Sequence, residues 1–172
     1  RMVRDLLDFT QARLGGGLKL ERSPLDLHTL VRGVVEEFQT THAQRALRLE
    51  QQGEGHGRWD GDRVAQMLGN LVANALKYSP PDTPVTVRSR GEAENVWLEV
   101  HNGGEPISPD ALPRLFQPLQ RAVESVDKIS RSVGLGLYIV EQIARAHGGD
   151  VQVRSSAPEG TTFTVRLPRG AA

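Results

Sequence analysis

The sequence predicts an α+β fold in which helices cover one face of a single mixed β-sheet. Segments with apolar residues at helical spacing are interspersed with segments in which apolar and polar residues alternate. Two pairs of these alternating segments are joined by short polar turns, which is typical of antiparallel hairpins. Such a pattern favours a two-layer sandwich, because each helix and each strand pair must bury one apolar face.

The first part of the chain predicts three helices and one strand. Residues 1–16 place apolar side chains three and four positions apart and run into three glycines, as a helix with a glycine C-cap would. A second helix is predicted over residues 28–45, and LRLEQQ follows it as an alternating strand. A third helix is predicted from about Asp60 to Tyr78.

The second part predicts two hairpins with helices between them. PVTVRSRG and VWLEVHN form the first hairpin, and DVQVRSS and TTFTVRLP form the second. Between them, DALPRLF predicts a short helix and RAVESVDKISRS, which lacks periodicity, predicts a mobile loop. The segment VGLGLYIVEQIARAHGG predicts a helix that is entered and left through glycines.

Composition excludes several classes of function. The 172 residues suffice for one domain and a short appendage, and 21 basic residues balance 21 acidic ones. This balance gives no reason to expect a nucleic-acid or membrane partner, so an anionic ligand must be held locally. There is no cysteine, which excludes disulfides and thiolate sites. With no signal peptide and no apolar run near the length of a membrane span, we expect a cytoplasmic setting.

The third helix carries an unusual polar stripe. Asn70, Asn74 and Lys77 step by four and three residues, so they share one side, away from the apolar stripe. Asparagine is a poor helix former, and Glu, Lys or Gln would suit a solvated face better. The stripe is either two tolerated surface amides or a ligand site, in which Asn74 offers an oxygen to a hard cation and Lys77 a charge to phosphate.

A phosphate site also needs a cradle, and GLGLYIV supplies a candidate. Gly134 and Gly136 precede an amphipathic helix, where a close backbone and free N–H groups favour an anion. The same glycines are equally consistent with a flexible helix entry. A Rossmann motif is disfavoured because its third glycine and its preceding buried strand are missing, and no Walker loop is present.

Together these motifs resemble a known family. NLVANALKYS, VHNGGEPISPDALPRLFQPL, GLGLYIVEQIARAHGG and SSAPEGTTFTVRLP look like the asparagine, first glycine, phenylalanine and second glycine boxes, in that order, of the ATP-binding domain of sensor histidine kinases. That domain shares a superfamily with gyrase, Hsp90-type chaperones and mismatch-repair ATPases. The resemblance implies a five-stranded mixed sheet with three helices on one face, binding Mg-ATP under a mobile lid. It divides the chain into the end of the second dimerisation and phosphoacceptor helix (1–16), a linker (17–24) and the ATP-binding domain (25–172).

The resemblance also implies roles for individual residues. Asn74 is the expected Mg²⁺ ligand, Asn70 is a neighbouring polar contact to the ion and the phosphates, and Lys77 holds phosphate. Asn74 and Lys77 are therefore the expected catalytic residues. The lid corresponds to residues 117–133, rooted at Phe116 and Pro118. Further nucleotide-binding residues implied are Tyr78, Asn102, Gly104, Ile107, Lys128, Arg131, Gly134, Leu135, Gly136, Leu137 and Thr162, with Arg121 as another lid cation. Each lid cation is also readily explained as a solvated charge.

One position separates kinase-like from hydrolytic relatives. Asn70 stands where the hydrolytic relatives carry a water-activating glutamate, and an amide cannot act as a general base. We therefore expect slow ATP hydrolysis and delivery of the phosphoryl group to a histidine. No histidine here is followed by the acid and proline of a phosphoacceptor box (His28, His42, His56, His101, His147), so the acceptor is expected upstream of Arg1 and the fragment is expected to lack autokinase activity alone.

The implied partners are the upstream helices, a response regulator and, in the full-length protein, a second copy in a homodimer. No nucleic acid and no membrane contact are expected. One alternative is a nucleotide-binding regulatory module of a sensor that acts mainly as a response-regulator phosphatase. Another is an anti-sigma-type serine kinase, which the helical lead-in LLDFTQARLGGG disfavours.

The first glycine box departs from the family pattern. In VHNGGEPI, Asn102 replaces the aspartate that reads the adenine amino group, and Pro106 replaces the second glycine, while Gly104 and Ile107 are kept. An amide oxygen still accepts a hydrogen bond but without charge assistance, so we expect weaker or less adenine-selective binding. The N-x-G-x-P-I form followed by LFQPLQRA is similar to a subset found in bacterial phytochromes.

Overall fold

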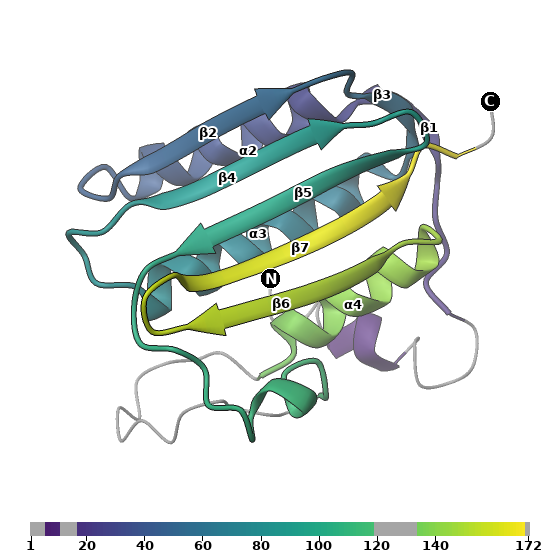
Figure 1. Cartoon of the computed structure of the whole chain (residues 1–172). Coiled ribbons are helices and arrows are strands. Elements are labelled where there is room, and N and C mark those ends of the chain that lie inside the picture. Colours follow the sequence, from purple (N-terminus) through teal and green to yellow (C-terminus); the bar gives the residue numbers. More distant parts are fainter. Residues whose placement is uncertain (1–5, 11–16, 119–133, 171–172) are drawn as a thin grey trace.

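The computed structural model describes residues 6–10, 17–118 and 134–170, and its centre is a five-stranded mixed sheet. The strands lie in the order β2-β4-β5-β7-β6 (Figure 1), with β2 and β4 parallel and all other neighbours antiparallel. Their bounds are β2 Leu47–Gln52, β4 Val85–Gly91, β5 Asn95–Asn102, β6 Asp150–Ser156 and β7 Gly160–Pro168. Both predicted hairpins, β4–β5 and β6–β7, are confirmed.

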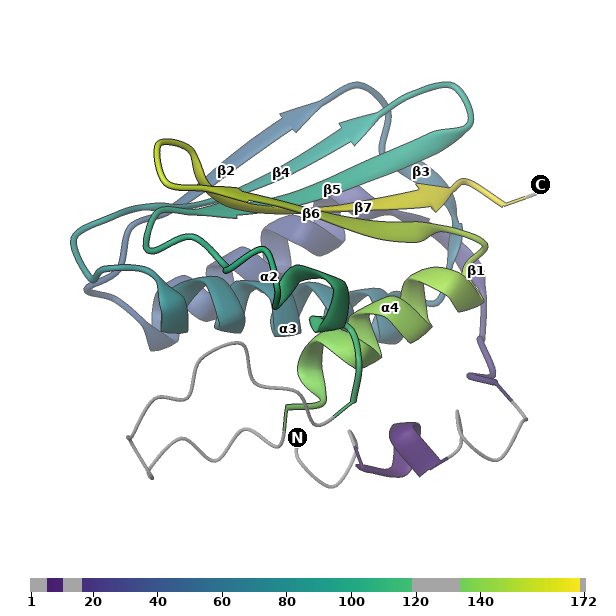
Figure 2. The ribbon, with the colours of Figure 1, turned by 60° about the horizontal axis from the view of Figure 1, so that its bottom comes forward.

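Three helices cover one face of this sheet, as predicted (Figure 2). They are α2 Leu27–Thr41, α3 Gly61–Tyr78 and α4 Gly136–Ala146, and a short 3-10 turn, Leu112–Arg114, stands where DALPRLF predicts a helix. The core lies between the two layers, where side chains of α3 and α4 such as Leu68, Leu71 and Ile143 pack against Leu98 and Val165 of the sheet. In the described ranges, no helix has both the length and the apolarity needed to cross a membrane.

Helix α2 ends at Thr41, four residues before the predicted end. Thr40 and Thr41 donate their hydroxyls to carbonyls of the preceding turn, and the N–H of His42 closes the helix on the Phe38 carbonyl at 2.8 Å. Such side-chain bonds compete with helix continuation. The sequence pattern overestimated the helix because apolar spacing says little about where the backbone stops.

A second, two-stranded sheet was not predicted. Strand β1, Ser23–Asp26, pairs antiparallel with β3, His56–Trp59. Each strand has four residues, too few to display an alternating pattern. The pair is fastened to the main sheet by Trp59, which is fully buried and donates its indole N–H to the Pro168 carbonyl at 2.7 Å.

A buried histidine, His147, joins helices α3 and α4. His147 caps α4 and is 2% exposed; its Nε2 accepts the Asp60 N–H at 3.1 Å, and its Nδ1 donates to the Ile143 carbonyl at 2.9 Å. Asp60 in turn caps α3, accepting the N–H groups of Arg63 and Glu21. The neutral ring therefore connects the end of α4 to the start of α3.

Protonation of His147 is expected to destabilise the domain. Burial lowers the pKa of His147 from the ordinary 6.5, and the charge of Arg22 acts in the same direction, against weaker opposing effects of the Ile143 hydrogen bond and Asp60. The unfolded chain then binds the proton more tightly, so this contribution to stability is complete above pH 6.5 and declines as the pH falls below it. Urea unfolding at pH 7.5 and 5.5 should show a smaller pH difference for His147→Gln than for the unaltered protein. Equal differences would contradict this role.

Candidate nucleotide-binding site

The predicted asparagine stripe of α3 lies beside the start of α4. Asn70 is buried, at 7% exposure, and its Nδ2 donates to the Gly136 carbonyl at 3.3 Å. One turn further along, Asn74 is half-buried, and Lys77 is exposed in the last turn. The structure therefore brings the asparagine helix and the glycine segment together, although they are 66 residues apart in the sequence.

Two glycines, Gly134 and Gly136, lie at the entry to α4. Gly134 has a φ of +72°, a conformation that favours glycine, and Leu135 is buried and precedes the first helical residue. A Cβ atom on Gly136 would lie 3.9 Å from Asn70 Cγ, so the backbone passes close to the asparagine. The first N–H groups of a helix have no partner within it and carry its positive dipole end. This arrangement suits an anion, while Leu137 packs against the core.

The C-terminal end of α3 is fixed from outside the helix. Arg45 donates to the Leu76 carbonyl at 2.8 Å and to Ser79 Oγ at 2.6 Å, where the helix ends. In the last turn of the helix, Tyr78 is 45% exposed, and the Lys77 ammonium lies 5.0 Å from the centre of its ring. The lysine and the tyrosine are thus held side by side at one end of the stripe.

A polar row crosses the helix-facing side of the sheet next to this end. Asn102, the last residue of β5, is 5% exposed and pairs in register with Thr161 of β7. Thr161 pairs with Ser155 of β6, their hydroxyls lie 2.7 Å apart, and the Ile107 N–H donates to the Ser155 hydroxyl at 2.9 Å. Asn102 Nδ2 donates to the Gly103 carbonyl at 2.6 Å, so its oxygen is the atom that can accept from a ligand.

Gly104 brings the segment after β5 against the end of α3. Its φ is +126°, and a Cβ atom there would lie 2.6 Å from the Tyr78 carbonyl oxygen. Only glycine permits this approach without displacement of the backbone. The close contact places Gly104 against Tyr78, while Asn102 and the Ile107 N–H meet the same polar row of the sheet.

The position of one predicted threonine needs correction. Thr162 points to the helix-free face of the sheet, where its hydroxyl lies 2.9 Å from His101 Nδ1. Its neighbour Thr161 is 5% exposed and lies on the helix-facing side beside Asn102. Side chains alternate along a strand, and the apolar Phe163 and Val165 already indicate that odd positions face the core. That alternation could have identified Thr161 from the sequence.

Of the predicted lid, residues 117–133, the structure describes 117 and 118. Arg121, Lys128 and Arg131 lie outside the described residues. At the lid's root, Phe116 packs edge to face against Phe163 of β7, with ring centres 6.2 Å apart, as its predicted anchoring role requires.

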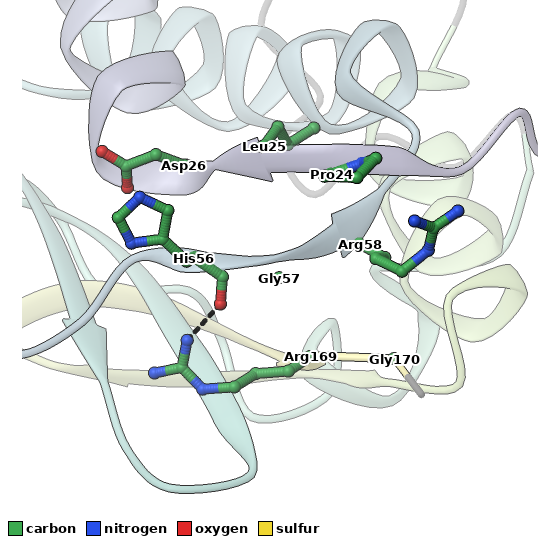
Figure 3. Close-up of a pocket in the computed structure, with 8 residues that line it drawn as sticks. All are labelled: Pro24, Leu25, Asp26, His56, Gly57, Arg58, Arg169 and Gly170. Atoms are coloured by element: carbon green, nitrogen blue, oxygen red, sulfur yellow. Dashed lines mark hydrogen bonds between the residues drawn. The ribbon is translucent and has the colours of Figure 1, made fainter. Parts of the chain in front are cut away.

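A separate open hollow of about 620 Å³ lies at the other end of the domain, beside β1 and β3 (Figure 3). None of the predicted site residues lines it; its lining residues are Pro24, Leu25, Asp26, His56, Gly57, Arg58, Arg169 and Gly170. The Arg169 guanidinium donates to the backbone carbonyls of Glu54, His56 and Glu92. Its role there is to fasten the two-stranded sheet, and the hollow is distinct from the nucleotide site.

Comparisons with known proteins agree with this geometry. Residues 59–171 match the family described as histidine kinase-, DNA gyrase B- and HSP90-like ATPase. The chain is 36% identical over 169 residues to the sensor histidine kinase CusS of Escherichia coli O157:H7, covering 98% of this chain and 35% of that protein. It is 31% identical over 168 residues to a bacteriophytochrome of Pseudomonas aeruginosa, covering 98% of this chain and 23% of that protein. The phytochrome likeness is therefore present but shared with other sensor kinases, and the chain spans about a third or less of these relatives' length.

Solved structures of histidine kinases share this fold. The nucleotide-free catalytic domain of histidine kinase ThkA superposes with a TM-score of 0.73 at 25% identity, covering 87% of this chain and 98% of that chain. Full-length ShkA in complex with AMPPNP superposes with a TM-score of 0.79 at 26% identity, covering 99% of this chain and 36% of that chain. The chain belongs to the histidine kinase-, DNA gyrase B- and HSP90-like ATPase family, and its fold is that of the histidine kinase catalytic domain.

Proposed function

We propose that this chain binds Mg-ATP and transfers the γ-phosphoryl group to a histidine of a helical domain upstream, for relay to a response regulator. In this proposal residues 1–16 end the second helix of that domain, 17–24 are a linker, and the full-length protein is a homodimer. The observation that carries the proposal is the hydrogen bond of Asn70 to Gly136, which sets the asparagine stripe of α3 against the glycine entry of α4. The relatives' names and the AMPPNP complex of ShkA support it.

The donor set fits a magnesium-bound triphosphate. Asn74 is half-buried and offers an amide oxygen, a ligand type that hard cations accept. Asn74 would hold a magnesium ion, which would supply positive charge against the negative charge that develops during transfer. Lys77 adds a positive charge, the first N–H groups of α4 hold phosphate oxygens, and the Asn102 oxygen accepts from the base.

Transfer in this site depends on positioning. Asn70 donates to backbone and its amide cannot remove a proton from water, so the chain has no general base at this position. The γ-phosphoryl group, held by Lys77, Asn74 and the α4 N–H groups, is therefore transferred to water only slowly and stays available for an acceptor side chain. Catalysis comes from alignment and charge stabilisation, with no covalent step on this domain.

The test has two stages. Calorimetry of this chain with AMPPNP should show binding that depends on Mg²⁺ and disappears with EDTA. In the full-length protein, γ-labelled ATP should then transfer acid-labile label to an upstream histidine. Rapid ATP hydrolysis by the isolated chain would contradict the assignment, and a full-length protein that only removes label from a phosphorylated regulator would support the phosphatase alternative.

Asn102→Asp is expected to tighten binding of adenine nucleotides about five- to tenfold. A carboxylate accepts from the adenine amino group with charge assistance, which adds on the order of 1 kcal/mol. Calorimetry with Mg-AMPPNP measures the gain, and the corresponding guanine nucleotide is the control, because its carbonyl repels a carboxylate. Unchanged adenine affinity would show that Asn102 does not contact the base.

A further inference from the structure

The helical turn at residues 6–10 lies against the two helices that build the nucleotide site (Figure 2). Asp8 is 3% exposed, and both its carboxylate oxygens accept from Arg63 Nη1 of α3 at 2.8 Å. Gln66, also on α3, donates to Asp8 Oδ2 at 2.8 Å. The neighbouring Phe9 meets Tyr138 of α4 edge to face, with ring centres 5.6 Å apart. Asp8 thus connects residues 6–10 to α3, and Phe9 connects them to α4.

These contacts lie on the site's own helices, close to its phosphate end. Arg63 precedes Asn70 by seven residues, which places it two turns earlier on the same side of α3. Tyr138 follows Gly136 by two residues in the first turn of α4. The hydrogen bond from Asn70 to Gly136 joins the same two helices directly. The segment therefore bridges the same two helices that this bond joins, two turns before Asn70 on α3 and two residues after Gly136 on α4.

We propose that residues 6–10 brace the nucleotide site, and that Asp8 and Phe9 are positioning residues for nucleotide binding although neither lies among the proposed ligand contacts. This inference rests on the proposed function. A buried carboxylate is stable only while its donors surround it, so Asp8 holds Arg63 and Gln66 in place, and Phe9 holds Tyr138. A site fixed in its binding geometry loses less entropy when the ligand binds.

The bracing must act in both directions. If the contact raises nucleotide affinity by some factor, bound nucleotide stabilises the contact by the same factor. The lead-in segment, which carries Leu6 and Leu7 with 54% and 58% of their surfaces exposed, is then held more firmly on the domain when nucleotide is present. Nucleotide occupancy is in this way transmitted to the part of the chain that precedes the domain.

The test measures Mg-AMPPNP affinity by calorimetry. Asp8→Asn and Phe9→Ala should each weaken binding about five- to tenfold, a typical size for coupling between sites. Asp8→Glu, which keeps the carboxylate, should restore most of the affinity. The control is Glu141→Gln, which removes an ion pair with Arg145 at 2.8 Å within α4 and should leave affinity unchanged.

Hydrogen exchange, measured on the unaltered protein and on Asp8→Asn, supplies a second readout that does not depend on calorimetry. Mg-AMPPNP should slow amide exchange at residues 6–10, and this slowing should disappear in Asp8→Asn. If the unaltered chain binds nucleotide but Asp8→Asn binds equally well, or exchange at 6–10 is unaffected, the brace is refuted and the proposed function stands. If the unaltered chain does not bind Mg-AMPPNP, both proposals are refuted.

Discussion

Replacing Asn74 with alanine is expected to reduce Mg-dependent nucleotide binding and phosphoryl transfer by about 100-fold or more. The change removes the amide oxygen assigned to the metal while leaving the fold intact, because the side chain is half-buried at the edge of the α3 stripe and outside the core. Calorimetry with and without Mg²⁺ measures the loss in this chain, and γ-labelled ATP measures it in the full-length protein.

The matched control for this change is Asn95→Ala. Asn95 begins β5, at the other end of the strand from Asn102, and accepts from Arg166 at 3.2 Å. Its replacement should leave nucleotide affinity unaltered. Retention of Mg-dependent binding by Asn74→Ala would show that the metal is held elsewhere.

Gly104→Ala is expected to cost about 3 kcal/mol of folding stability and at least tenfold in nucleotide affinity. Two effects combine: an L-residue at a φ of +126° is strained, and its Cβ would lie 2.6 Å from the Tyr78 carbonyl oxygen. The backbone must move, and with it the position of Asn102, two residues earlier, relative to the end of α3. Urea unfolding gives the stability change and calorimetry gives the affinity.

Gly148→Ala separates the two effects. Gly148 has a similarly positive φ, +78°, but apart from its chain neighbours no atom of the described residues lies within 4 Å of the position its Cβ would take. This variant should lose only about 1 kcal/mol from backbone strain, without change in affinity. Equal losses for the two variants would show that the close approach of Gly104 to α3 has no energetic importance.

The main layers of the fold could be predicted because their signals are local. The apolar stripe of α3 and the alternation in both hairpins are each read within one segment, and the structure confirms them. Strands β1 and β3 escaped prediction because four residues carry no usable period. Their place is set by Trp59, whose partner Pro168 is 109 residues away.

In the candidate site, too, residues with a local sequence signal were predicted and residues defined by distant contacts were not. Asn70, Asn74 and Gly136 were recognised from motifs, and the structure brings their segments together. The motif pointed to Thr162, whereas strand alternation puts Thr161 on the helix-facing side with Asn102. His147 and Asp8 were beyond prediction, since a histidine at a helix end and an acid on a lead-in helix are ordinary in sequence. Only tertiary contacts 87 and 55 residues distant bury them.

Helix α3 connects the point where the incoming chain is attached to the opposite end of the candidate site. The incoming chain is tied to its first turn, where Asp60 accepts the Glu21 N–H at 2.9 Å, and the base end of the site lies at its last turn. An 18-residue helix is about 27 Å long. A tilt of about 5° at the tied end would move the other end by about 2 Å. A small tilt of α3 at its attached end therefore produces a larger displacement at its last turn, beside the proposed base contact. Hydrogen bonds there tolerate displacements of only a few tenths of an ångström.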